Sequence, residues 1–488
     1  MTTKSVNNNK DLAVILKGTG ISLIGKAANA IIQFGFLVLM TRLLGAKAAG
    51  IYFLGYAFHQ VGLTIGSFAL NNTACRYFPI VANPKALASQ LFQLLFVISF
   101  ISFSILMIIV TAVLPALNQN VYPKVYFLFL LAVPFAAWMT LQVGIFLGMK
   151  RMLPGTVVQE IFYPSIRLLM FLSLFWMGLR LEAALFAFFI SSMLSAVLGW
   201  VWLQHDLSLF SGNGKAPLPT KQELLHFSAP IMLAMVINLG ITAGMPILIS
   251  CFASVNEVAL FGAASRIIVL FDLAIIAVNG LFAPTISEYL SQGRLTELKV
   301  LFRKLTAFVL TLTAPFVAAC IFFPKEIMGL FGHEFAQGSS YLTILAIGEL
   351  MNVATGSVGQ FLLMGGHSRL LLALTATANV LAIIVALSTV NIIGSSSFAV
   401  GTATGVVCVN LLALIFVWRL QGLHPFDKGM VLLCGLSSLP VFIMHFSFSI
   451  WTTMILYIVW TCCILLVGSF QFGEQTFMLA IIKKLKRV

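Results

Sequence analysis

The chain has 488 residues, of which 60% are hydrophobic and only 9% are charged, and its mean hydropathy is +1.05. A soluble protein does not bury that much apolar surface, so the composition excludes the soluble classes and predicts a polytopic membrane protein. The formal net charge of +14 is interpreted below as a signal of membrane topology, and nucleic acid is not expected as a partner.

The apolar segments recur as long runs, and not as alternating ten-residue strands, so we predict an all-α bundle of about fourteen transmembrane helices. Residues 1–11 are polar and are predicted to form a short cytoplasmic tail. The predicted spans are 15–40, 48–74, 87–114, 124–148, 156–177, 181–204, 226–252, 257–283, 304–324, 338–364, 369–393, 397–419, 428–447 and 450–470.

The first span carries a lysine near mid-depth. Lys26 lies about 11 residues into the span, or roughly 16 Å along the axis, and Ser22, Asn29 and Gln33 share its helical face. A central lysine costs about 2.5–3.5 kcal/mol on insertion scales, so it should face protein or water and not lipid. The stripe predicts a helix that lines a hydrated, substrate-binding cavity. A structural pair between Lys26 and a buried glutamate is the alternative.

Two further predicted contacts come from the second and fifth spans. Tyr52, Tyr56 and His59 follow one another along the second span and are predicted to contact sugar, with a packing histidine as the alternative for His59. In the fifth span Glu160 and Arg167 share a face with a proline that permits a bend. Arg167 either reaches the cavity or extends toward the membrane interface.

The longest connection lies between Gln204 and Glu223 and contains the Gly/Pro-rich segment SGNGKAPLPT. It suggests four parts, which are an N-terminal six-helix bundle, a cytoplasmic linker, a C-terminal six-helix bundle, and two additional helices with a basic cytoplasmic tail. Their predicted limits are 1–205, 206–225, 226–420 and 421–488.

Charged residues of the second half give further candidates. Arg266 lies about ten residues into the eighth span, and it either binds substrate or pairs with Asp272 of the same helix. Glu349 and Asn352 begin a polar stripe in the tenth span that continues to Gly356 and Gln360. Burial disfavours a charged carboxyl, so Glu349 or Asp272 is predicted either to couple transport to a proton or to neutralise an arginine.

The basic residues predict the orientation. With the N-terminus in the cytoplasm, twenty of the 28 Lys and Arg residues fall on the cytoplasmic side, five on the outer side and three within spans. This bias follows the positive-inside rule. It places both termini of the multi-pass protein in the cytoplasm, and the family resemblance described below implies a bacterial inner membrane. The KKLKR sequence near the C-terminus is expected to lie on anionic headgroups.

The two halves of the chain resemble each other at nearly constant offsets of 215, 216 and 209 residues. The matching segments are VGIFLGMKRML (143–153) with VGQFLLMGGHS (358–368), VWLQ (201–204) with VWRLQ (417–421), and AGIYFLGYA (49–57) with VALFGAASR (258–266). Three matches in order indicate a duplication. Because each copy has an even number of spans, the copies form a parallel repeat, which favours transport by alternating access.

The opening GTGISLIGKAANAIIQFGFLVLMTRLLGAKAAGIYFLGYAF, with its TRLLG and GxY elements, resembles polysaccharide-biosynthesis flippases of the Wzx type. These belong to the MOP superfamily, which also contains MATE drug exporters and the lipid II flippase MurJ. The segment KAAGIYFLGYAFHQ differs from the corresponding MurJ pattern. The resemblance implies the MATE/MurJ-like fold, and it implies that cations of the first and eighth spans, here Lys26 and Arg266, line a central cavity.

We therefore predict a flippase for undecaprenyl-diphosphate-linked oligosaccharide (an O-antigen or exopolysaccharide repeat unit), driven by an ion gradient or the membrane potential. Membrane lipids and a neighbouring polymerase or glycosyltransferases are the expected partners. We expect no catalytic residues, cofactor or metal, because the seven cysteines show no ligand spacing and no phosphate-binding GxxxxGK[ST] motif occurs. A MATE-like multidrug or cation antiporter is the main alternative. A membrane polymerase or ligase is a weaker one, because the outer loops are short.

Overall fold

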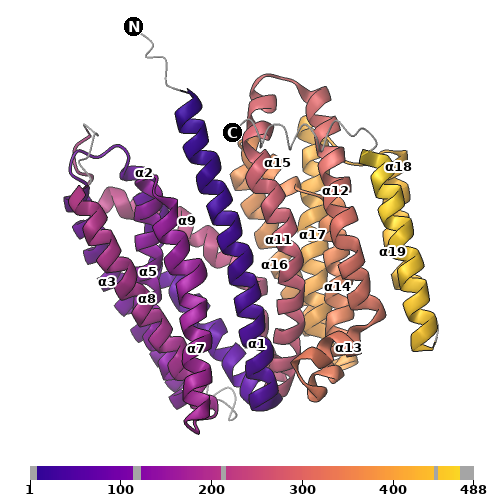
Figure 1. Cartoon of the computed structure of the whole chain (residues 1–488), viewed down its shortest axis with the longest axis horizontal. Coiled ribbons are helices and arrows are strands. Elements are labelled where there is room, and N and C mark those ends of the chain that lie inside the picture. Colours follow the sequence, from indigo (N-terminus) through magenta and orange to yellow (C-terminus); the bar gives the residue numbers. More distant parts are fainter. Residues whose placement is uncertain (1–7, 114–122, 210–215, 444–448, 473–488) are drawn as a thin grey trace. The chain divides into compact units, whose positions relative to one another are not determined.

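The computed structural model describes residues 8–113, 123–209, 216–443 and 449–472 (Figure 1). These residues are almost wholly helical, and within them the β structure is limited to one isolated bridge between Val81 and Ala216. In the described ranges ten helices are long and apolar enough to cross a membrane, or up to eleven when one bent pair counts as a span. The prediction of an all-α polytopic membrane protein is confirmed.

Helix α1 (Asn8–Ser67) contains the first predicted span and most of the second. Gly45 interrupts it with φ 79° and ψ 175°, while the residues on either side are helical. Glycine adopts a positive φ with little strain because it has no Cβ. The glycine that ends the TRLLG motif therefore marks the junction that the sequence predicts between residues 40 and 48. This junction within one helix is one reason why the helix count is lower than fourteen.

The chain divides into two compact units, which are Met1–Ala259 and Leu260–Val488. The predicted division at the linker 206–225 concerns the sequence repeat and stays a prediction. The first unit contains α1, α2 (Leu70–Tyr77), α3 (Pro84–Ile108), η1 (Ile109–Val113), α5 (Pro123–Gly148), α6 (Met152–Thr156), η2 (Val157–Phe162), α7 (Tyr163–Trp176), α8 (Leu181–Leu209), α9 (Lys221–Thr242) and α10 (Gly244–Phe252).

Helix α5 packs against α1, α2, α3 and α8 in the first unit. Leu141, Ile145 and Phe146 of α5 join a buried apolar cluster with residues of α2, α3, α8 and α9. Gly144 permits this packing, because a Cβ there would lie 2.4 Å from the carbonyl oxygen of Asn71. The Gly144–Gly148 pair is thus a helix-packing motif of the GxxxG type.

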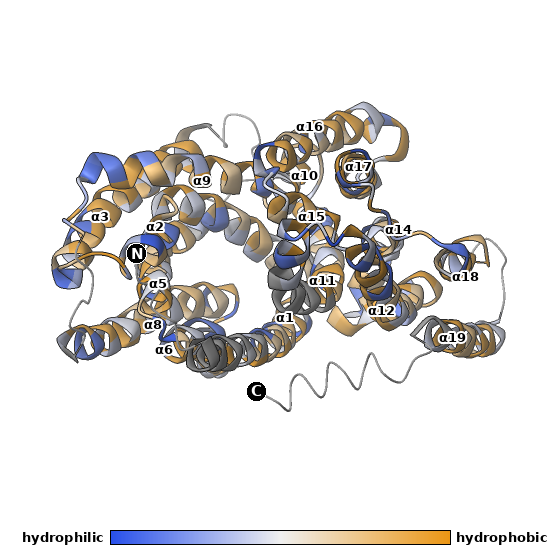
Figure 2. Cartoon of the chain, turned by 90° about the horizontal axis from the view of Figure 1, so that it is seen from above, coloured by the Kyte–Doolittle hydropathy of each residue, from blue (hydrophilic) through white to orange (hydrophobic). Residues whose placement is uncertain are grey.

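Helix α11 (Val255–Ser291) begins at the end of the first unit and continues into the second. The remaining helices of the second unit are α12 (Leu295–Phe322), α13 (Pro324–Met328), η3 (Gly329–Phe331), η4 (His333–Gly338), α14 (Ser339–Thr355), α15 (Val358–Met364), α16 (Ser368–Ile393), α17 (Ser396–Gln421), α18 (Lys428–Ile443) and α19 (Ile450–Phe472). Figure 2 shows that apolar residues dominate these helices, as they do in the first unit.

The last two helices, α18 and α19, pack against α12 and against each other. The Tyr457 hydroxyl donates to the carbonyl of Pro315 at 3.1 Å, and Trp460 Nε1 donates to the carbonyl of Leu436 at 2.7 Å. Helix α19 is therefore fixed to its neighbours by hydrogen bonds as well as by apolar contact.

The predicted tenth span is not one straight helix. Helices α14 and α15 meet at an angle of 47°, and Gly356 between them has φ 70°. A Cβ at Gly356 would lie 2.2 Å from Thr306 Oγ1, so both the conformation and the close approach of α12 require glycine. The polar stripe expected from Glu349 to Gln360 is wrong beyond Asn352, because the helix ends at Thr355.

Candidate functional site

Four polar side chains form a continuous hydrogen-bonded chain between α1 and the η2–α7 segment, which we call the polar chain. Asn29 Nδ2 donates to Glu160 Oε2 at 2.5 Å. Gln33 Nε2 donates to Asn29 Oδ1 at 2.7 Å. Arg167 Nη2 donates to Gln33 Oε1 at 2.7 Å. Both amides thus turn their donors toward Glu160 and their acceptors toward Arg167, so their dipoles point from one charge to the other.

Local helix geometry brings these residues together. Asn29 and Gln33 are four residues apart on α1, so they share a face. Glu160 lies in the π-helical turn η2, and Pro164 follows at the start of α7. Proline has no N–H to donate to the preceding turn, and π turns occur where the regular hydrogen-bond ladder is disturbed. Glu160 and Arg167, seven residues apart, lie at the two ends of the Asn29–Gln33 pair.

Arg167 is buried, with only 2% of its surface exposed. Its guanidinium carbon lies 4.8 Å from the ring centre of Phe36, 5.1 Å from that of Tyr163 and 5.9 Å from that of Phe188. Within the described residues Arg167 forms no ion pair, and its Nε has no hydrogen-bond partner. Cation–π contacts contribute about 2 kcal/mol when desolvated. They only partly offset the cost of removing a cation from water, which is several kcal/mol.

The aromatic residues predicted on α1 lie beside this arginine. The rings of Tyr52, Tyr56 and His59 all contact Phe188 of α8, with centroids 6.2, 6.0 and 4.7 Å away. His59 is 2% exposed, and its Nδ1 lies 2.9 Å from the carbonyl oxygen of Phe129. This environment is the one expected for the packing histidine. Contact between these side chains and sugar stays a prediction.

Lys26 occupies a different environment from its stripe neighbours. Its side chain is exposed and has no hydrogen-bond or ionic partner in the part of the chain that the structure describes. The preceding residue, Gly25, packs closely on the end of α6, where a Cβ would lie 2.2 Å from Thr156 Cγ2, and Glu160 Cβ is in ordinary contact at 3.4 Å. Lys26 therefore lies next to the polar chain without joining it. Among the described residues no ion pair joins Lys26 to a glutamate, which was the structural alternative that the sequence left open.

The candidates of the second unit lie on α11 and α14. Glu349 is 4% exposed, and Asn352 Nδ2 lies 3.2 Å from each of its carboxylate oxygens. Arg266 is half-buried on α11. The side chain of Asp272 lies outside the described residues, so its predicted pairing and coupling roles stay predictions. No group of three potential metal ligands occurs in the described parts of the chain.

The sequence did not identify two members of the first-unit site. Phe188 is one of 43 phenylalanines, and only the fold shows that it contacts Arg167, His59 and both tyrosines. Glu160 shares a face with Arg167 in the sequence, but its bond to Asn29 spans 131 residues. A carboxylate and an arginine on one face of an apolar span were the available signal for Glu160.

Comparison with known proteins identifies the family. A model of the polysaccharide biosynthesis protein family matches residues 15–290, which is more than half of the chain. The chain belongs to the polysaccharide biosynthesis protein family. The MatE family model matches residues 230–387, so this family member also carries a MATE-type segment. No curated protein matches the sequence.

Solved structures with the same fold include members of the MOP superfamily. The lipid II flippase MurJ matches with a TM-score of 0.64 at 14% identity, over 93% of this chain and 99% of that one. A multidrug resistance MATE family transporter matches with a TM-score of 0.62 at 15% identity, over 81% and 94%. A MOP superfamily transporter from Pyrococcus furiosus gives 0.56 at 15% identity, over 84% and 95%.

The MOP superfamily resemblance and the MATE/MurJ-like fold are thus confirmed. The matching proteins are transporters and a flippase, not catalysts, which agrees with the prediction that this family member is not an enzyme. Together with the family match, the apolar helices identify a multi-pass membrane protein.

Proposed function

We propose that the protein is a Wzx-type flippase that moves undecaprenyl-diphosphate-linked oligosaccharide from the cytoplasmic to the periplasmic leaflet of a bacterial inner membrane. Translocation proceeds by alternating access, and an ion gradient or the membrane potential supplies the energy. The family match and the MurJ-like fold support a flippase. The substrate, the membrane and the orientation are part of the proposal.

The buried guanidinium of Arg167 is the observation that carries this proposal. It lies among an amide and three aromatic rings and has no ionic partner within the described residues. A guanidinium forms strong charge-assisted bonds with phosphate oxygens, and its Nε is still without a partner. A diphosphate that leaves water needs such a group. In a carrier for cationic drugs, a buried positive charge would instead repel the drug and weaken its binding.

The other candidate residues have complementary proposed roles. Lys26, exposed beside the polar chain, attracts the diphosphate first, and Asn29 and Gln33 provide amides for its polar surroundings. Tyr52, Tyr56 and His59 supply aromatic surface for sugar. Asn352 and Arg266 are the proposed contacts of the second unit, and Glu349 or Asp272 carries the coupling proton. A polymerase and glycosyltransferases are the proposed neighbours in the membrane.

A MATE-like cation antiporter is the second candidate. It is favoured by the MatE match over residues 230–387 and by the buried carboxyl of Glu349. A buried carboxylate is the group that such a carrier uses to compensate a cation in a low-dielectric site. The two candidates therefore differ in the sign of charge that crosses the membrane.

Proteoliposomes distinguish the two functions. The purified full-length protein is reconstituted with a fluorescent polyprenyl-diphosphate oligosaccharide, and the label exposed in the outer leaflet is quenched by a membrane-impermeant reductant over time. The flippase function predicts rapid loss of label beyond the outer-leaflet half, whereas empty liposomes keep half. If no diphosphate lipid moves but a cationic dye accumulates against a proton gradient, the antiporter is the correct function.

A further inference from the structure

The first unit contains a groove between α3 and α8 that has no role in the proposed transport site. It has a volume of about 700 Å³ and is lined by Lys85, Ala88, Ser89, Phe92, Gln93, Phe96, Val97, Trp200, Gln204, Leu207 and Ser208. Phe92 and Trp200 meet edge-to-face across it with ring centroids 5.0 Å apart. Two neighbouring spans therefore enclose the groove, and it does not depend on the second unit.

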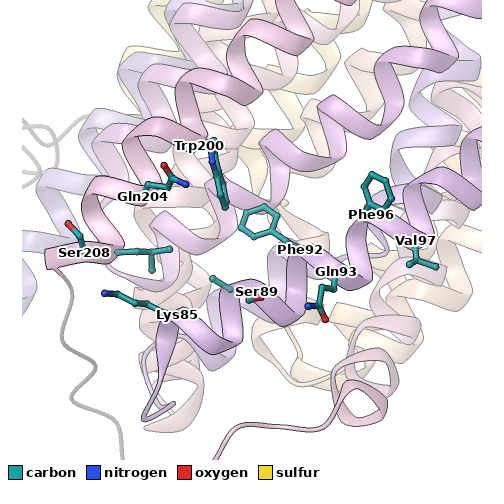
Figure 3. A pocket seen from close by; sticks show the side chains of 11 residues that line it. Lys85, Ser89, Phe92, Gln93, Phe96, Val97, Trp200, Gln204 and Ser208 are labelled. Carbon is teal, nitrogen blue, oxygen red and sulfur yellow. The ribbon is translucent and has the colours of Figure 1, made fainter.

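Polarity changes systematically along this groove. Figure 3 shows Lys85, Gln204 and Ser208 at one end and Phe96 and Val97 at the other, with Phe92 and Trp200 between them. At about 1.5 Å per residue, Phe96 lies roughly 16 Å along the helix from Lys85. The side chains of Phe96 and Val97 are 69% and 56% exposed. The groove thus runs from a cationic end, past a tryptophan, to an open apolar surface.

A second lysine, Lys221, contacts the groove at Gln93, between Lys85 and the apolar end. Lys221 Nζ donates to Gln93 Oε1 at 3.2 Å. Lys221 is the first residue of α9, and a reciprocal capping box between Thr220 and Glu223 fixes this helix start. None of the residues that line the groove is acidic. The local charge therefore complements an anion.

We propose that this groove binds one anionic phospholipid of the bilayer. Its phosphate lies at Lys85, its glycerol region lies between Gln204, the indole of Trp200 and the Lys221–Gln93 pair, and an acyl chain covers Phe96 and Val97. A free phosphate ion does not account for the apolar half, and a transmembrane helix of another protein does not account for the two lysines. Tryptophan at the boundary between polar and apolar regions is typical of residues at the headgroup level.

The expected selectivity follows from the charges. A lysine near a membrane surface contributes about 1 kcal/mol toward an anionic lipid, which corresponds to about a fivefold preference for each lysine. The groove should therefore bind phosphatidylglycerol in preference to phosphatidylcholine, and added salt should reduce the preference.

Trp200 provides a direct measurement. The full-length protein is placed in nanodiscs with increasing dibromo-phosphatidylglycerol or dibromo-phosphatidylcholine, and bromine quenches indoles that it contacts. The Trp200 signal is the difference between the protein and Trp200→Phe. We expect stronger quenching by phosphatidylglycerol, with a preference that falls about fivefold in Lys85→Gln and in Lys221→Gln. Lys428→Gln, an exposed lysine at the start of α18, should keep the preference.

Three results would overturn the proposal. Equal quenching of Trp200 by the two lipids would show that the groove does not select charge. Quenching by neither lipid would mean that something other than lipid, such as a partner helix, fills it. If Lys428→Gln lost the preference for phosphatidylglycerol to the same extent, the effect of the lysines would not be specific to the groove. Native mass spectrometry of the same variants, which counts retained phosphatidylglycerol, gives a readout independent of Trp200. Neither measurement depends on the transported substrate.

Discussion

At the scale of single residues, the polar chain shows what a sequence predicts and what it does not. Asn29 and Gln33 were predictable because two amides four residues apart stand out in an apolar span. Their partners were not, because the bond from Arg167 to Gln33 spans 134 residues and nothing local indicates which spans face each other. Lys26 attracts more notice in the sequence than Arg167, yet Arg167 is the cation that the fold buries.

The coupling between Gln33 and Arg167 is testable through stability. Gln33→Leu removes the acceptor of a buried guanidinium and should lower the free energy of unfolding by about 1–3 kcal/mol. Gln33→Leu combined with Arg167→Leu should cost less than the two single variants together, since removing both partners of a buried polar pair can be nearly neutral. Denaturant titration of the detergent-purified protein measures this. Strict additivity of the two single effects would refute the coupling.

At the scale of elements, the apolar runs predicted the helices well, whereas the interruptions were harder to predict. All fourteen predicted spans overlap helices of the described chain. The π turn at residues 157–162 and the 47° bend between α14 and α15 were missed. Both depend on close contacts and backbone hydrogen bonds that hydropathy does not encode. Gly45 and Gly356 show that the sequence contains the breaks, but glycines also occur inside these helices for packing.

Glycine packing gives a prediction with an internal control. Gly144→Val adds a side chain against the backbone of Asn71 and should destabilise the first unit by about 1–3 kcal/mol, as overpacking does. A Cβ added at Gly435 of α18 would have no atom within 4 Å. Gly435→Ala should therefore leave the free energy of unfolding unchanged or raise it by up to about 1 kcal/mol. Thermal unfolding followed by size-exclusion chromatography compares the two. A Gly144→Val protein as stable as the parent would contradict the close contact of α2 and α5.

At the scale of the whole molecule, composition predicted a membrane protein. The distribution of Lys and Arg predicted an orientation in the membrane that the fold does not test. The positive-inside bias places the turn at Gly178, between α7 and α8, outside the cytoplasm. It places the turn at Gly366, between α15 and α16, inside. A side chain added at either glycine would meet open space, so short insertions should be tolerated there.

Protease sites inserted after Gly178 and Gly366 test this topology. External protease should cleave intact spheroplasts at the first site only, and both sites should be cleaved after lysis. Cleavage of intact spheroplasts at Gly366 but not at Gly178 would show that the orientation is inverted. The direction of transport proposed above would then be reversed.

The central claim is that a buried arginine carries an anionic lipid head across the membrane. The most direct measurement is the proteoliposome assay with Arg167→Gln, compared with Arg180→Gln as a control for an exposed arginine at the end of the same segment. We predict that Arg167→Gln lowers the flipping rate of the diphosphate lipid by at least about tenfold, as expected for loss of a charged hydrogen bond, while the protein stays folded. Arg180→Gln should flip at the parental rate. If folded Arg167→Gln flips the diphosphate lipid at the parental rate, Arg167 does not carry the lipid head across the membrane.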